Sequence, residues 1–179
     1  MKQEAEPEVE LPEVDISALP EHIQAALQRA GWSGLKPVQL RTIPYLLDGE
    51  DVMIQARTGS GKTGAFLLPL LELLDFTENS CQVLVLVPTR ELANQVWNEA
   101  QTLFGDTGLR SVAVYGGVGY GAQTEALKKG AHVVIGTPGR VLDHLLRRTF
   151  NLRDLRILIF DEADRMLSMG FYQDMKAVQ

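Results

Sequence analysis

From residue 52 onward the chain repeats one unit: a short apolar run, a polar turn and an amphipathic helical pattern. The apolar runs are Val52–Ile54, Val83–Val87, Val112–Val114, His132–Ile135 and Ile157–Phe160. They are rich in Val, Ile and Leu and mostly do not alternate with polar residues, which is typical of strands buried on both faces. The helical patterns that follow the first four runs cover about Lys62–Leu74, Arg90–Phe104, Gly121–Lys129 and Pro138–Arg148. Such alternation predicts an α/β fold with a mostly parallel sheet and helices on both faces.

A glycine-rich loop joins the first apolar run to the first helical pattern. It consists of Ala56, Arg57, Thr58, Gly59, Ser60, Gly61, Lys62 and Thr63. The two glycines allow a tight turn in which successive backbone N–H groups converge at the N-terminus of the following helix, where the helix dipole favours anions. Lys62 adds a mobile positive charge for phosphates, and Thr63 offers a hydroxyl to Mg²⁺. A chance match is the alternative, but the strand–loop–helix context favours a nucleotide phosphate site.

Every conspicuous polar or glycine-rich cluster follows a predicted strand directly. These clusters are Ala56–Thr63, Pro88–Leu92, Gly116–Gly121, Thr137–Arg140 and Asp161–Asp164. Parallel strands bring their carboxyl ends to one edge of the sheet, where open α/β folds bind ligands. We therefore expect this edge to be the active surface.

Two adjacent acids end the last apolar run. Asp161 is placed to hold Mg²⁺ against a nucleotide, partly through water, and Glu162 to orient or deprotonate an attacking water. A solvated acidic turn that caps the next helix is the alternative. The phosphate loop in the same chain favours the metal and water roles.

Two threonines look like helix N-caps, and each is followed closely by an arginine. Thr89 precedes Arg90, and Thr137 precedes Pro138 and Arg140. Capping and turn chemistry would explain each cluster separately. Together, two helix N-termini and two guanidinium groups on one edge suggest a track for a phosphate backbone that is contacted without reading the bases.

The length of 179 residues and a hydrophobic content of 45% fit one globular domain. No apolar run approaches the roughly 20 residues that span a bilayer, and the acidic N-terminus does not look like a signal peptide. Cys81 is the single cysteine and cannot form an internal disulfide, which favours a reducing cytoplasm. The three histidines lack metal-ligand spacing, so we expect ordinary surface or strand-end roles for them.

The N-terminal part is predicted to be an acidic leader followed by two helices. Residues 1–13 alternate Glu with Pro and Val and are expected to be disordered. Apolar spacing predicts a helix from Pro20 to Ala30 that stops at Gly31, and a second one from Val38 to Leu47. Most of the net charge of −6 lies in the leader and its junction, so the acidic balance does not argue against a nucleic-acid partner.

Taken together, the clusters resemble the motifs of the DEAD-box RNA helicases, in the order of that family. The matching segments are residues 56–63 (motif I), 88–92 (motif Ia), 116–117 (the GG motif), 137–140 (motif Ib) and 161–164 (motif II). Residues 31–39 resemble the Q motif. The resemblance covers residues 14–179 and implies a P-loop NTPase domain of RecA-like fold, the ATP-binding N-terminal half of an ATP-dependent RNA helicase.

The resemblance also implies a role for each site residue, with ATP and Mg²⁺ as cofactors. Gln39 would read the adenine edge, and loop 56–63 would hold the phosphates. The catalytic residues would be Lys62, Asp161 and Glu162, and the metal-binding ones Thr63 and Asp161. Asp164 would couple to a second RecA-like domain. The RNA backbone would be lined by Pro88, Thr89, Arg90, Gly116, Gly117, Thr137, Gly139 and Arg140.

Three departures from the family pattern stand out. Leu35-Lys36 replaces the usual Pro-Thr pair of the Q motif, and Val14 stands where an aromatic residue usually stacks on adenine. The sequence also stops at Gln179, before motif III and the second RecA-like domain, which predicts low stability and a missing central strand.

Two other functions stay open: a P-loop motor that acts on DNA, and a non-catalytic nucleotide-binding or adaptor fragment.

Overall fold

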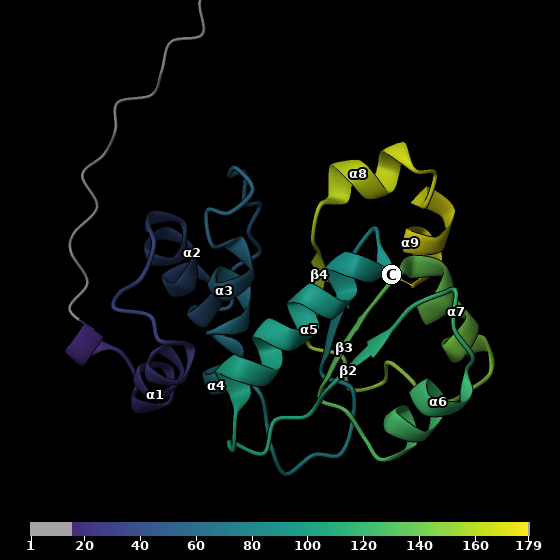
Figure 1. The fold of residues 1–179 in the computed structure, drawn as a ribbon, viewed down its shortest axis with the longest axis horizontal. Helices are drawn as coiled ribbons and strands as arrows, with labels where there is room; N and C mark the ends of the chain where they lie inside the picture. Colours follow the sequence, from purple (N-terminus) through teal and green to yellow (C-terminus); the bar gives the residue numbers. More distant parts are fainter. Residues whose placement is uncertain (1–15, 179) are drawn as a thin grey trace, which may run out of the picture. The chain divides into compact units, whose positions relative to one another are not determined.

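The computed structural model describes residues 16–178. The predicted leader 1–13 and the adenine-stacking position Val14 lie outside these residues. The chain divides into two compact units, residues 1–72 and 73–179 (Figure 1).

The first unit is helical in its described part. Its elements are η1 (Ile16–Ala18), α1 (Glu21–Ala30), α2 (Pro37–Leu47) and α3 (Lys62–Leu67), while α4 (Leu70–Leu73) crosses the boundary between the units. Helix α1 buries Ile23, Ala26 and Leu27, whose spacing predicted it. It ends at Gly31 in the left-handed region, at φ 67°, as the sequence suggested.

Two predictions for this unit are wrong. Residues 52–54 form no strand, and Val52 and Met53 are 38% and 99% exposed. A strand needs a neighbour for its backbone groups, and within residues 16–178 no other strand pairs with this segment. The predicted helix Lys62–Leu74 is divided into α3 and α4, because Pro69 has no N–H to donate to the helix ladder.

The second unit contains a four-stranded parallel sheet, as predicted. Its strands are β1 (Val83–Leu86), β2 (Ser111–Val114), β3 (Val133–Gly136) and β4 (Ile157–Phe160). They lie in the order β2-β3-β1-β4, and every pair is parallel. The polar clusters after all four strands therefore lie at one edge of one sheet. Among the described residues β4 pairs only with β1.

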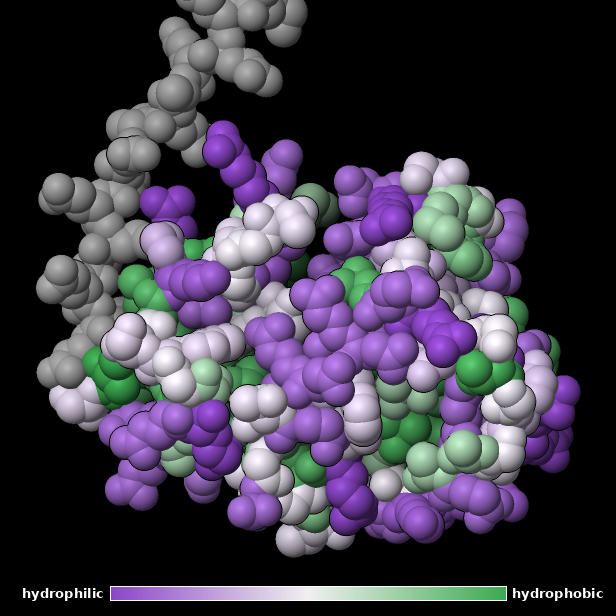
Figure 2. Space-filling view, in the orientation of Figure 1, coloured by the Kyte–Doolittle hydropathy of each residue, from purple (hydrophilic) through white to green (hydrophobic). Residues whose placement is uncertain are grey.

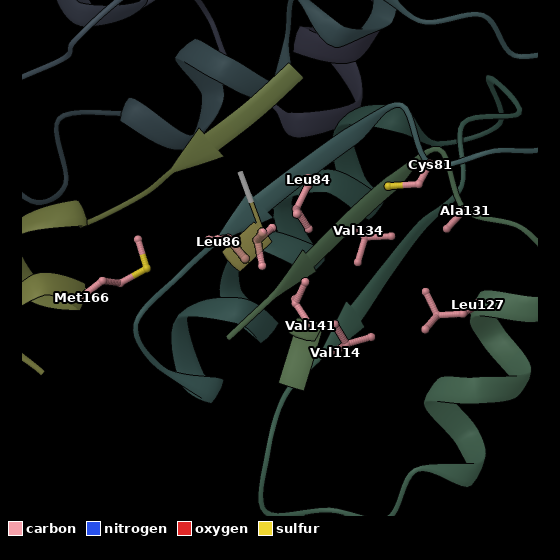
Figure 3. Close-up of a cluster of buried hydrophobic side chains, with 10 residues drawn as sticks. Cys81, Leu84, Leu86, Val114, Leu127, Ala131, Val134, Val141 and Met166 are labelled. Atoms are coloured by element: carbon pink, nitrogen blue, oxygen red, sulfur yellow. The ribbon is translucent and has the colours of Figure 1, made fainter. Parts of the chain in front are cut away.

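Helices cover both faces of this sheet (Figure 1). Helix α5 (Arg90–Phe104) packs beside β2 and β3 through its buried stripe. The opposite face meets α6 (Gly121–Lys128), α7 (Pro138–Leu146), α8 (Ala163–Ser168) and α9 (Tyr172–Val178). Figure 3 shows the core on that side, where Leu84, Leu86 and Val134 of the strands meet Val141 of α7. The α/β fold with helices on both faces is thus confirmed.

Cys81 belongs to this core and is 6% exposed. Burial raises the pKa of its thiol to about 12, so the group stays protonated and unreactive. Cys81 is therefore a packed, structural thiol.

The surface of the described residues is mixed in character on the face that Figure 2 displays. Hydrophilic residues cover much of that face, and hydrophobic ones lie in small groups between them (Figure 2). Within the described residues, no helix combines the length and the apolar character needed to cross a membrane.

Candidate functional site

The glycine-rich loop of the first unit has the backbone that phosphate binding needs. Gly59 and Gly61 both have positive φ, at 79° and 97°. Gly61 is also the N-cap of α3, so the loop leads directly into a helix N-terminus. The positive φ of Gly61 favours glycine, and a Cβ there would also have to displace the side chain of Lys36, whose Cδ would lie 2.8 Å away. The loop–helix half of the predicted context is confirmed.

The ammonium group of Lys62 lies over the loop itself. Its Nζ donates to the carbonyl oxygens of Ala56, at 2.5 Å, and Arg57, at 3.0 Å. Lys36, which replaces the usual threonine of the Q motif, donates through Nζ to the carbonyl of Gly59 at 3.1 Å. Two lysine side chains therefore reach the backbone of this loop. A groove lined by α2 and residues 50–56 adjoins it.

Gln39 is tied to both the Q motif and the phosphate loop. Its Oε1 accepts from the backbone N–H of Lys36 at 2.7 Å, and its Nε2 donates to the carbonyl of Gly61 at 3.1 Å. The residue is 1% exposed. Both ends of the amide that we expected to read adenine thus contact the protein backbone, and base reading by Gln39 stays a prediction.

Gly64, which sequence reasoning overlooked, lets α3 approach the Q motif. A Cβ there would lie 2.6 Å from the ring of Trp32 and 2.7 Å from Nε2 of Gln39. Only a residue without a side chain allows this contact without displacing the ring or the amide. The signal in the sequence is a glycine inside a helical pattern, where glycine is otherwise unfavourable.

The acidic pair of the second unit follows β4. Asp161 donates its backbone N–H to the carbonyl of Leu86, which holds it at the carboxyl end of the strand. Glu162 adopts the left-handed region with φ 54°, unusual for a residue with a side chain and a feature often found at functional sites. Its carboxylate accepts from Nη1 of Arg165 at 3.1 Å, and Asp164 is exposed.

Motif Ia and the loop of residues 116–119, which contains the GG motif and is called the GG loop below, come together at the carboxyl edge of the sheet. Thr89 caps α5, accepting the N–H of Leu92 at 3.2 Å, as predicted. The exposed guanidinium of Arg90 lies 5.1 Å from the ring centre of Tyr115. A Cβ on Gly117 would stand 4.0 Å from Nη1 of Arg90, so the arginine lies beside the glycine loop.

Motif Ib differs from its prediction in two details. Thr137 occupies the N-cap position of α7, with Pro138 after it, but its side chain makes no capping hydrogen bond. Arg140 does not present its guanidinium to solvent, because the residue is 8% exposed. Instead Nη1 donates to Oε1 of Gln123 at 3.2 Å and Nη2 to the carbonyl of Val118 at 2.9 Å.

Two buried histidines, His132 and His144, are expected to make the stability of the fold depend on pH. Burial and nearby arginines, Arg110 for His132 and chiefly Arg140 for His144, lower the pKa of both imidazoles. Both are 0% exposed, so the expected surface role of His144 is wrong.

The predicted Mg²⁺ ligands carry the oxygen donors that this ion prefers. They are the hydroxyl of Thr63 in the first unit and the carboxylate of Asp161 in the second.

We expect the free energy of unfolding to fall as the pH drops below about 6.5. The unfolded chain then binds protons at His132 and His144, while the folded chain keeps both imidazoles neutral until its own, lower pKa values are reached. Denaturant unfolding at pH 7.5, 6.5 and 5.5 measures this effect. The variant His132→Asn should show a smaller change in the free energy of unfolding with pH. Equal stability of the unsubstituted protein at all three pH values would contradict the account.

A phosphate loop at a helix N-terminus and a parallel sheet with its polar clusters at one edge define a P-loop α/β protein. Residues 36–179 match the family described as DEAD/DEAH box helicase. The chain belongs to this family, as its motifs suggested.

Known relatives and solved structures agree with this assignment. The chain is 50% identical to the ATP-dependent RNA helicase DeaD of Haemophilus influenzae, over 89% of this chain and 26% of that protein. It is 46% identical to the DEAD-box ATP-dependent RNA helicase CshA of Streptococcus pneumoniae, over 93% of this chain and 31% of that one. A crystal structure of a DEAD box protein from Methanococcus jannaschii superposes with a TM-score of 0.83 at 42% identity, covering 90% of this chain and 44% of the other. The chain thus spans 26% to 31% of the length of these two curated relatives.

Proposed function

We propose that this chain is the ATP-binding and RNA-contacting N-terminal RecA-like part of an ATP-dependent RNA helicase, in which ATP hydrolysis drives local separation of RNA strands. The observation that carries the proposal is the formed phosphate loop before α3 in the same chain as a parallel sheet with polar clusters after all four strands. The names of the relatives support RNA as the substrate.

The phosphate loop and the acidic pair act on ATP. Backbone N–H groups of residues 56–63 bind the phosphates together with Lys62, whose ammonium exchanges loop carbonyls for phosphate oxygens. Thr63 and Asp161 would hold Mg²⁺, which would supply positive charge to offset that of the phosphates. Glu162 takes the proton of the attacking water.

The edge residues of the second unit bind the sugar-phosphate backbone of RNA. The exposed guanidinium of Arg90 and the exposed glycines Gly116 and Gly117 contact phosphates. The N-terminus of α7 adds the backbone N–H of Gly139 and the hydroxyl of Thr137, whose own N–H donates to the carbonyl of Val114. Pro88 and Thr89 shape the track by starting α5. Because these groups face backbone rather than bases, binding is independent of sequence.

Two further assignments rest on indirect support. The lengths of the relatives support a second RecA-like domain as the partner of the exposed Asp164. A lone, buried cysteine supports a reducing compartment such as the cytoplasm.

Replacing Gln39 with Ala should narrow the difference between ATP and GTP affinity by roughly 1–3 kcal/mol. Beyond its two hydrogen bonds to the backbone, the amide keeps one acceptor site and one N–H for the base edge, and both are lost in alanine. Because Gln39 also holds the carbonyl of Gly61, overall affinity should fall as well. Titration with fluorescent ADP and GDP analogues separates the two effects. Gln39→Glu is the control that keeps the acceptor for the N–H of Lys36. Undiminished adenine preference in both variants would place base discrimination elsewhere.

Strand displacement by the full-length protein tests the proposed function directly. A short RNA duplex should separate only when ATP is present, and Lys62→Ala should lose nearly all nucleotide affinity and all displacement. Its fold should remain, because the hydrogen bonds of the Lys62 ammonium go to the carbonyls of Ala56 and Arg57 in the loop. Circular dichroism checks this point. Displacement without ATP, or an active Lys62→Ala variant, would reject the proposal.

A further inference from the structure

Tyr120, at the start of α6, is enclosed by one stripe of α7. The guanidinium carbons of Arg140 and Arg147 each lie 4.0 Å from its ring centre. These arginines are seven positions apart, about 10 Å along a helix, so the ring lies between them. The two residues between them on the stripe complete the contact: Asp143 accepts the Tyr120 hydroxyl through Oδ2 at 2.7 Å, and His144 meets the ring edge-on at 5.5 Å.

Gln123, one turn further along α6, contacts two of the same side chains, Arg140 and His144. Its Oε1 is shared by Nη1 of Arg140 and Nε2 of His144, each at 3.2 Å. Its Nε2 donates to the carbonyl of Tyr115 at 3.1 Å. Gln123 is 8% exposed and His144 is 0% exposed, so these bonds are shielded from water. Loss of the amide would leave a buried guanidinium and a buried imidazole short of a partner.

These contacts hold both ends of the GG loop. Gln123 binds the carbonyl of Tyr115, just before the loop, and Arg140 binds the carbonyl of Val118 within it. Residues 116–119 are themselves exposed, and Gly117 adopts a positive φ of 79°. A glycine loop with exposed backbone has little rigidity of its own. Its shape is therefore set by side chains of α6 and α7.

We propose that Tyr120 and Gln123 are positioning residues for the RNA-contacting loop 116–119, acting through the buried guanidinium of Arg140. The proposal rests on the proposed RNA-binding function of this edge. It assigns the Arg140 side chain to the loop rather than to a phosphate. Tyr120 and Gln123 touch no substrate in this scheme; they hold the GG loop and the N-terminus of α7 in one arrangement, so that RNA does not have to order them on binding.

The test compares Tyr120→Leu, Tyr120→Phe and Gln123→Ala in the full-length protein. Leucine keeps an apolar side chain without a ring, whereas phenylalanine keeps the ring between the two guanidinium groups and loses only the hydroxyl. Glu125→Gln on the exposed side of α6 is the matched control. RNA-stimulated ATP hydrolysis gives KM for a single-stranded RNA and kcat at saturating RNA. Affinity for a fluorescent ADP analogue without RNA and the thermal unfolding midpoint are measured alongside.

We expect Tyr120→Leu and Gln123→Ala to raise KM for RNA by about tenfold or more. The first removes the aromatic ring from the guanidinium groups of Arg140 and Arg147, and the second removes a hydrogen bond to the charged Arg140. Values of kcat at saturating RNA and ADP affinity should stay within about twofold, and Tyr120→Phe should restore KM most of the way. Unchanged KM in folded Tyr120→Leu and Gln123→Ala proteins would overturn the inference. An equal loss of ADP affinity would show a general structural role instead and would also overturn it. Absence of RNA-stimulated ATP hydrolysis in the wild type would instead reject the proposed function.

Discussion

Replacing Glu162 with Gln should stop ATP turnover in the full-length protein while leaving ATP binding intact. The amide keeps the size of the side chain and an oxygen that can accept from Nη1 of Arg165. It cannot take a proton from water, and loss of a general base costs about 10²–10⁴-fold in rate. Single-turnover hydrolysis of labelled ATP, with binding measured separately, is the suitable assay.

Asp154→Asn, an exposed acid outside the predicted motifs, is the control for a general effect of lost charge. It should hydrolyse ATP at the wild-type rate. Hydrolysis at that rate by Glu162→Gln would show that the left-handed backbone at Glu162 serves the turn into α8 rather than the chemistry.

A polypeptide of these 179 residues alone should hydrolyse ATP about 10³–10⁵-fold more slowly than the full-length protein, the range that an arginine finger contributes. From the resemblance to the DEAD-box family, we expect that arginine in a second RecA-like domain. The two arginines of motifs Ia and Ib are poor substitutes. Arg90 lies beside the GG loop, and Arg140 donates to Gln123 and Val118. Phosphate release in saturating RNA measures the difference.

Adding the remainder of the protein in trans should restore part of this rate. The same addition to a Lys62→Ala polypeptide should restore nothing, which controls for a contaminating ATPase. Rapid RNA-stimulated turnover by the 179 residues alone would contradict the need for a second domain.

The sheet of the second unit could be predicted because its strands are buried on both faces. Val83–Leu86 is fully buried, and such runs differ clearly from the amphipathic stripe of α5. Val52–Ile54 has the same apolar composition but forms no strand in the described residues. Composition gives the tendency of a segment to form a strand, whereas the pairing of that strand depends on a neighbouring strand elsewhere in the chain. Pro69 shows a different limit, since one missing N–H divides a strong helical pattern.

At the candidate site, backbone features were easier to predict than side-chain networks. The turn at Gly59 and Gly61 and the cap at Thr89 follow from local chemistry that the sequence states directly. Tyr120 and Gln123 were missed because their partners lie on another helix. A signal did exist, because a polar stripe at helical spacing requires a polar partner if it is buried. This stripe consists of Arg140, Asp143 and His144 on α7 and Arg147 at its C-cap.

Stimulation of ATP hydrolysis by RNA in the full-length protein is the measurement that tests the proposed coupling of ATP to RNA. Hydrolysis should rise on addition of a single-stranded RNA and should rise far less with DNA of the same sequence, because the 2′-hydroxyl distinguishes the two backbones. The RNA-dependent part should disappear in Lys62→Ala. Equal stimulation by RNA and DNA would instead indicate a DNA motor, and hydrolysis indifferent to both would contradict the account.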